Sequence, residues 1–186
     1  MSKYPAAIFA AIILMMPPVI LTSQGRLSAP LTFPAINSAA QVSGWTASII
    51  EKRKPDLHPV TLGKIRAGRH ARFDRVVFEF SGGAVPGYHI EYVDRPVRAC
   101  GSGDTVRVSG DRWLSVRLTP AQAHTDAGEP TIKYRERRLR FPVLKELQST
   151  CDFEGEVEWV LGVSSPNRYR VMELSNPARL VIDIKR

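Results

Sequence analysis

The sequence contains few of the residues that build metal and redox sites. Its 186 residues include only two cysteines and four histidines. No CxxC pair and no Cys/His cluster with zinc-ligand spacing is present, and the histidines lie far apart in the sequence. The motifs HExxH and GxSxG are also missing. We therefore predict no cofactor, no metal site and no catalytic residue.

Charge is nearly absent from the first 50 residues, which hold only Lys3 and Arg26. All 18 acidic residues and the other 24 basic ones follow, so the rest of the chain carries 24 − 18 = +6 of the net charge of +8. A basic protein is attracted to polyanions such as nucleic acid, anionic lipid or acidic wall polymers. A solvated arginine-rich surface is the simpler interpretation. No nucleic-acid partner is expected, because no RNP-type motif is present.

The N-terminus has the layout of an export signal. Lys3 precedes 16 uncharged residues, Ala6 to Leu21, as a basic n-region precedes an apolar h-region. The run is shorter than the roughly 20 apolar residues of a membrane span, and its two prolines would break a helix. A clean A-x-A cleavage site is missing. We predict that residues 1–22 are a signal peptide or an uncleaved membrane anchor, and that the protein is periplasmic or otherwise extracytoplasmic.

Residues 23–59 are rich in Ser, Thr, Ala and Pro and are predicted to form a flexible linker. Only the stretch Ser43 to Lys54, with Trp45, Ile49 and Ile50, has the composition of a short helix or strand.

Export would decide whether the two cysteines, Cys100 and Cys151, are oxidised. In an oxidising compartment, two distant cysteines form one disulfide. Closing a loop of roughly 50 residues would stabilise the fold by about 4 kcal/mol in the chain-entropy model. In the cytosol both would remain thiols.

From Val60 onward, short alternating runs are separated by Gly, Pro, Asn and Asp, which is typical of β-strands and turns. The predicted strands are Val60–Ala67, Phe73–Phe80, Tyr88–Val93, Thr105–Val108, Trp113–Leu118, Phe153–Val163, Tyr169–Glu173 and Arg179–Ile184. The segment Pro142–Gln148 is predicted as a short helix, because Val143, Leu144 and Leu147 have near-helical spacing. The predicted fold class is all-β: a β-sandwich of about seven or eight short strands with one short helix, or a partly open barrel.

Four acidic residues recur at every second position: Asp152, Glu154, Glu156 and Glu158. On one extended strand they would form an acidic face. Calcium binding and glycoside hydrolysis both use carboxylates, but evenly spaced strand carboxylates diverge and do not wrap an ion. A solvated face that pairs with bases on a neighbouring strand is the simpler interpretation.

Two further patterns supply candidate binding residues. The segments Arg75–Phe80 and Arg179–Ile184 share the order Arg-apolar-Val-apolar-acid-apolar. Within each strand the Arg and the acid lie about 13 Å apart, so each needs a partner on a neighbouring strand. The run KYRERRLR at 133–140 places Tyr134 among bases and is suited to contact an anionic polymer. The candidates are Arg75, Arg179, Tyr134, Arg135 and Arg137.

Five segments together resemble the AMIN-like domain family of exported bacterial proteins. They are RAGRHARFDRVVFEF (66–80), PGYHIEYVDRP (86–96), LSVRLTPAQAH (114–124), DFEGEVEWVLGV (152–163) and NPARLVIDI (176–184). The resemblance covers most of residues 60–186 and implies a β-sandwich in the cell envelope. The broader AMIN domains look like targeting modules that sit beside peptidoglycan amidases and secretins. The resemblance supplies no catalytic residues.

The resemblance and the export signal together favour a non-catalytic binding or targeting module that contacts cell-wall glycan or an envelope protein, with a possible membrane tether through the N-terminus. Two alternatives remain: a wall-glycan hydrolase that uses the acidic strand face, and a carrier of a small ligand.

Overall fold

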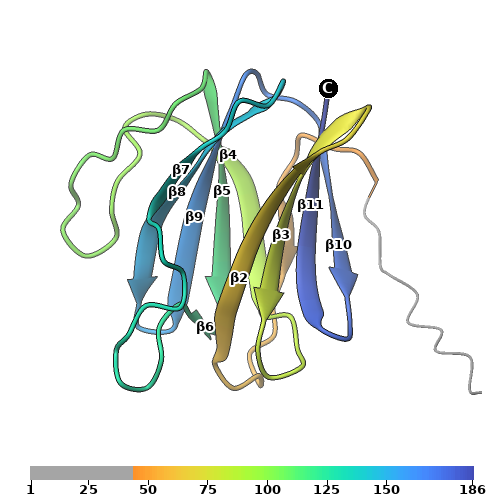
Figure 1. Cartoon of the computed structure of the whole chain (residues 1–186). Helices are drawn as coiled ribbons and strands as arrows, with labels where there is room; N and C mark the ends of the chain where they lie inside the picture. The colour runs from red at the N-terminus through yellow and green to blue at the C-terminus, as the bar shows by residue number, and fades with distance from the viewer. Residues whose placement is uncertain (1–43) are drawn as a thin grey trace, which may run out of the picture. The chain divides into compact units, whose positions relative to one another are not determined.

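The computed structural model describes residues 44–186 as two β-sheets (Figure 1). The predicted signal segment, 1–22, and the linker as far as residue 43 lie outside the described residues. The six-stranded sheet has the order β1 (Ile50–Lys52), β4 (Gly87–Val93), β5 (Arg112–Thr119), β9 (Glu156–Val163), β8 (Leu144–Phe153), β7 (Glu136–Arg138). The five-stranded sheet has the order β10 (Tyr169–Leu174), β11 (Ala178–Lys185), β3 (Phe73–Phe80), β2 (Val60–Arg69), β6 (Ala121–Gln122). Among the strands of residues 44–186, β2 and β6 alone pair in parallel.

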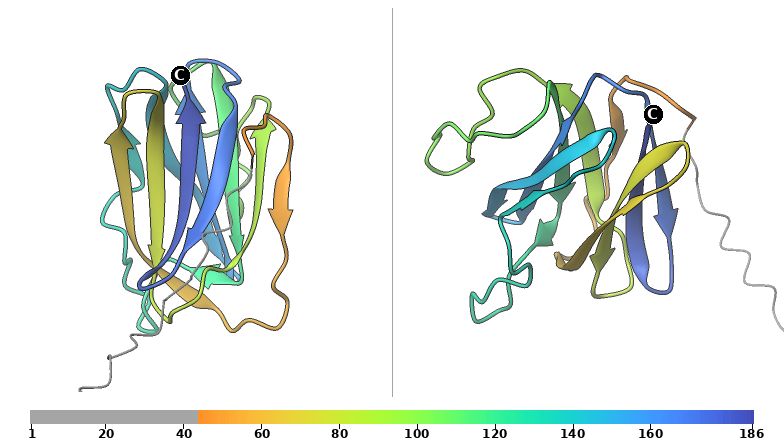
Figure 2. Two further views of the ribbon diagram at one scale, coloured as in Figure 1. Left: turned by 90° about the vertical axis from the view of Figure 1, so that its right-hand side faces the viewer. Right: turned by 45° about the horizontal axis from the view of Figure 1, so that its top comes forward.

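Alternation of buried and half-buried residues explains why these segments form strands. In β3, Asp74, Val76, Phe78 and Phe80 are buried and the residues between them are half-buried. Since neighbouring strand residues point to opposite faces, one face of the sheet meets the core and the other meets solvent. One buried cluster includes Phe78 and Leu180 of the five-stranded sheet with Leu114 and Trp159 of the six-stranded sheet. The two sheets therefore pack face to face around one core (Figure 2), a sandwich-like arrangement that confirms the all-β prediction.

The predicted short helix at Pro142–Gln148 is wrong, because strand β8 begins at Leu144. A bulge shifts the register between Leu144 and Glu146, so Leu144 and Leu147 both reach the core although three positions separate them. This spacing imitates one helical turn. The carboxylate of Asp74 accepts hydrogen bonds from the backbone N–H groups of Val143 and Leu144 at 2.8 and 3.0 Å and fixes the start of the strand.

The predicted strand Phe153–Val163 is also interrupted. Glu154 and Gly155 have φ angles of 50° and 77° and form the turn between β8 and β9. Two consecutive residues with positive φ are the signature of a tight type I′ hairpin. The four alternating acids therefore do not share one strand face. The predicted strand Thr105–Val108 is likewise not formed, and only an isolated bridge joins Thr105 to Arg98.

Part of the stretch predicted as a linker belongs to the fold. Strand β1 pairs with β4, and Thr46 exchanges backbone hydrogen bonds of 2.9 and 2.7 Å with Tyr169 at the start of β10. The hydroxyl of the buried Tyr169 lies 2.7 Å from the carbonyl of Ser48 and 2.9 Å from that of Ile90. Residues 44–52 thus join the edges of the two sheets on this side of the molecule.

The predicted disulfide between Cys100 and Cys151 is present. It fastens the loop 94–111 onto the outer face of the six-stranded sheet. Beneath the loop, Val97 and Val108 pack on Trp113 and Val160 in a second small apolar cluster. Among residues 44–186, no helix is long and apolar enough to cross a membrane.

Candidate binding cavity

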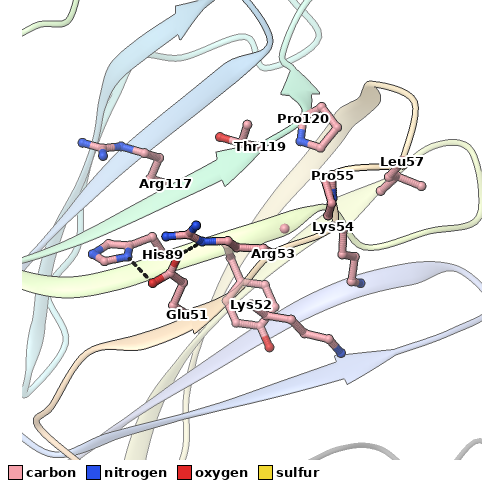
Figure 3. A pocket seen from close by; sticks show the side chains of 12 residues that line it. Glu51, Lys52, Arg53, Lys54, Pro55, Leu57, His89, Arg117, Thr119 and Pro120 are labelled. Atoms are coloured by element: carbon pink, nitrogen blue, oxygen red, sulfur yellow. Dashed lines mark hydrogen bonds and ion pairs between the residues drawn. The ribbon is translucent and has the colours of Figure 1, made fainter.

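Within residues 44–186, three cavities lie along the six-stranded sheet: one of about 410 Å³ lies under the loop 94–111, and the other two lie at opposite edges of the sheet and are the candidates for a functional site. The larger, of about 560 Å³, lies beside β1 and the ends of β4 and β5 (Figure 3). Gly87 forms part of its wall, where a Cβ atom would stand 2.6 Å from the carbonyl oxygen of Thr119. Only glycine allows the backbone to approach this closely.

The charged groups of this larger cavity are already paired with each other or with neighbouring carboxylates. Arg53 and His89 contact Glu51 (Figure 3). Lys52 and Lys54 hold the two oxygens of Glu173 at 2.7 and 3.0 Å. Burial alone would raise the pKa of Glu173, but the hydrogen bonds from these two lysines outweigh it and leave the pKa below its usual value. This cluster ties β1 to β10 across the sheet edges.

The second cavity, here named the β6–β8 cavity, has a volume of about 420 Å³. Its walls come from the loop between β6 and β7 and from strands β8 and β9. The lining residues are Ala123, His124, Gly128, Pro130, Ile132, Lys133, Tyr134, Arg135, Ser149, Asp152 and Trp159. The volume is within the range of sites that hold small ligands.

The loop that forms this cavity bridges the two sheets. The hydroxyls of Thr131 and Tyr134 donate hydrogen bonds to the carbonyls of Leu62 and Ile65 on β2, at 2.6 and 3.2 Å. On its other side, the carbonyl of Arg135 accepts a 2.7 Å hydrogen bond from the backbone of Ser149 on β8. Both sides of the loop are anchored, so the cavity has fixed walls.

Trp159 provides an unsatisfied donor at this cavity. Its side chain is only 2% exposed, and the indole N–H has no hydrogen-bond partner within the described part of the chain. The ring of Tyr134 stands edge to face against the indole, with centroids 5.9 Å apart. The indole nitrogen itself is not exposed to the cavity, so an acceptor on a ligand would satisfy this donor only if neighbouring side chains, such as the ring of Tyr134, move aside.

Cationic side chains lie at the rim of the β6–β8 cavity. Lys133 and Arg135 are exposed, and no carboxylate among residues 44–186 forms an ion pair with either. The guanidinium of Arg137 lies 5.8 Å from the centre of the Tyr134 ring, which is cation–π distance. The rim is therefore suited to an anionic group of a ligand.

His124 and Asp152 form a pair on the same wall. The histidine Nδ1 atom lies 3.1 Å from both carboxylate oxygens, and Asp152 also accepts a 2.9 Å hydrogen bond from the backbone of Ala123. Ser149 lines the cavity as well, but among the described residues its hydroxyl makes no hydrogen bond to His124. A nucleophile–base contact is thus not assembled. Residues 44–186 also contain no group of three or more His, Cys, Asp or Glu side chains that could hold a metal ion.

The structure separates the five predicted binding residues into two groups. Tyr134 and Arg135 line the β6–β8 cavity, and Arg137 lies beside Tyr134. Arg75 and Arg179 lie on the outer face of the five-stranded sheet, where each stands opposite the acid of the other strand. Arg75 makes two hydrogen bonds to Asp183, at 2.6 and 2.9 Å. Arg179 instead donates to the carbonyl of Pro177.

The acidic row is also divided. Asp152 enters the β6–β8 cavity, and Glu154 lies in the turn. Glu158 accepts hydrogen bonds from the hydroxyls of Ser115 and Thr150 at 2.6 and 2.8 Å. Sequence reasoning missed the pair of His124 with Asp152, because the two are 28 residues apart and no local pattern joins them.

Comparison with known proteins gives one match. No curated protein and no solved structure matches this chain. The sequence model of the AMIN-like domain matches residues 60–186, which is more than half of the chain and includes all strands except β1. The chain therefore belongs to the AMIN-like domain family.

Proposed function

We propose that this protein is a non-catalytic, exported binding module of the bacterial cell envelope, and that its β6–β8 cavity takes a fragment of wall glycan. Family membership supports the envelope setting, since AMIN domains in general bind peptidoglycan. The disulfide fits an oxidising compartment. The observation that carries the assignment to this cavity is the partnerless indole N–H of Trp159.

The chemistry of the cavity matches such a ligand. Peptidoglycan sugars carry acetamido carbonyls, which accept hydrogen bonds, and their peptide stems carry carboxylates. Lys133 and Arg135 supply exposed cations for a carboxylate, and the indole N–H of Trp159 supplies a donor for a carbonyl once the side chains that cover it move aside. The larger cavity beside β1 offers less, because its cations already hold carboxylates.

Calorimetric titration with a soluble disaccharide-peptide tests the proposal. Trp159→Phe keeps most of the ring volume and removes the N–H, so affinity should fall about tenfold, as expected for the loss of one buried hydrogen bond. Arg135→Gln should also weaken binding. Arg53→Gln is its matched control, since it removes the same charge from the other cavity.

Equal losses in Arg135→Gln and Arg53→Gln would show that only net charge matters. Retention of the full chain on purified peptidoglycan no greater than that of a similarly basic protein would refute the wall-glycan proposal altogether. Release of soluble products from the same material would favour the hydrolase alternative.

A further inference from the structure

The two outer faces of the paired sheets differ in charge. On the five-stranded sheet, the registers of β2, β3, β11 and β10 place six basic side chains on the face opposite the core: Lys64, Arg66, Arg75, Arg170, Arg179 and Lys185. Only two acids, Glu79 and Asp183, share that face. The face therefore carries 6 − 2 = +4, and we name it the basic face. Figure 2, left, shows its four long strands side by side.

The outer face of the six-stranded sheet carries mostly acidic side chains on four of its strands. Across β1, β4, β5 and β9 it presents Glu51, Glu91, Glu156 and Glu158, with Arg117 as the base among them. Arg117 is held by Glu156 at 3.3 Å and by Glu158 at 3.7 Å. The outer face of these four strands therefore carries a net negative charge, in contrast to the basic face.

An aromatic cluster lies at one end of the basic face. The ring of Trp45 has the guanidinium of Arg170 at 4.6 Å and the ammonium of Lys185 at 5.9 Å from its centre. The ring of Phe73 is 6.4 Å away. Tryptophan beside cations is the pairing found where proteins meet the headgroup region of a membrane. Trp45 is also next to Gly44, the first described residue, and the apolar run 6–21 precedes it in the sequence.

We propose that the basic face docks on an anionic lipid surface. The four long strands form a patch roughly 15 Å by 26 Å, from the spacing between strands and the rise per residue. A rigid sheet of this size can present its bases to a planar surface at the same time, whereas a single flexible polymer chain would meet them only a few at a time. The basic face and the β6–β8 cavity are different parts of the surface. The lipid-docking proposal can therefore be tested independently of the wall-glycan proposal.

Binding of the full chain to vesicles tests this proposal. The probes are vesicles of phosphatidylcholine alone and of phosphatidylcholine mixed with phosphatidylglycerol. Each base near an anionic surface contributes about fivefold in affinity, so Lys64→Gln with Arg179→Gln should lower the partition coefficient on anionic vesicles about thirtyfold. Neither residue holds a buried carboxylate, so both substitutions should leave the fold intact.

The matched control is Arg53→Gln with Arg138→Gln, which removes two exposed charges from the six-stranded side of the molecule. The apolar run is common to all three proteins, so the ratios of their partition coefficients report the sheet faces. As a second readout, mixed vesicles that contain brominated phosphatidylglycerol should quench the fluorescence of Trp45, identified by comparison with Trp45→Phe, and vesicles of brominated phosphatidylcholine alone should not. Equal weakening in both double variants, or equal quenching by the two kinds of vesicle, would overturn the proposal.

Discussion

Arg75 and Arg179 are the first residues of the two segments with the same residue pattern, yet the structure predicts that removing Arg75 costs much more stability than removing Arg179. The carboxylate of Asp183 is fully buried and is held by Arg75 and by Arg170, whose Nε and Nη2 atoms lie 2.9 and 2.8 Å from one oxygen. Arg75→Ala would leave this buried charge with one arginine. Arg179→Ala would remove only a contact to a carbonyl at the exposed end of the same strand.

The cost of each change can be estimated. Removing one partner of a buried ion pair costs about 3–5 kcal/mol when nothing replaces it. Arg170 remains in place here, and the side chain of Arg75 is 30% exposed, so water can enter the vacated space. We therefore expect Arg75→Ala to lower the free energy of unfolding by about 2 kcal/mol. Surface substitutions without such a partner usually stay within about 0.5 kcal/mol, and this is the expectation for Arg179→Ala.

Urea unfolding at neutral pH, followed by circular dichroism, measures both variants. With a slope of about 1–3 kcal/mol per molar urea, the midpoint of Arg75→Ala should fall by roughly 1 M and that of Arg179→Ala by a few tenths at most. Comparable midpoints for the two variants would refute the reasoning, because the buried carboxylate would then not depend on Arg75. A larger loss in Arg179→Ala would refute it more strongly.

Three other predictions concern the supports of the fold. Replacing both cysteines, Cys100→Ser with Cys151→Ser, opens a loop with a sequence separation of 51 and should cost about 4 kcal/mol in denaturant unfolding; a loss below 1 kcal/mol would show that the apolar contacts of the loop suffice. Gly87→Ala forces a Cβ to within 3.0 Å of the carbonyl of Lys52 and should cost about 1–3 kcal/mol, whereas Gly101→Ala, with nothing within 4 Å, should be tolerated. The folded-state pKa of Glu173 lies below 4.5, so the ionised carboxylate stabilises the fold above about pH 4.5, and this stabilisation is lost as the pH falls further. The melting temperature of Glu173→Gln should therefore depend less on pH in this range than that of the unchanged protein.

Alternation alone was sufficient to predict most of the long strands. The segment FDRVVFEF has a buried residue at every second position, and β3 covers the whole segment. The same rule failed where backbone geometry broke the period. At β8 a bulge brought Leu144 and Leu147 to one face, and the residues between Asp152 and Glu158 alternate through a turn that reverses the chain. Strand and helix patterns are both recognised over only a few residues. One bulge residue can therefore make a strand look helical, and one tight turn can make two strands look like one.

The candidate site was predictable only in part, for a related reason. The composition of the run 133–140 identified Tyr134, Arg135 and Arg137 because clustered bases and an aromatic are visible in the sequence. The groups that give the cavity its polar walls, His124 with Asp152 and the indole of Trp159, come from three separate segments. Their meeting depends on the pairing of β8 with β9 and on the path of the loop after β6, which local patterns do not encode.

The position of the cavity follows from the lengths of the edge strands. On one side of the molecule the gap between the sheets is closed by β1, by the hydrogen bonds of Tyr169 and by the lysines on Glu173. On the other side the edge strands β6 and β7 have only two and three residues. Strands this short cannot cover the core, so a loop spans the gap and leaves the indole of Trp159 beside an open space. Short edge strands also limit pairing with other chains. The short edge strands that limit pairing with other chains therefore also place a cavity next to a buried donor.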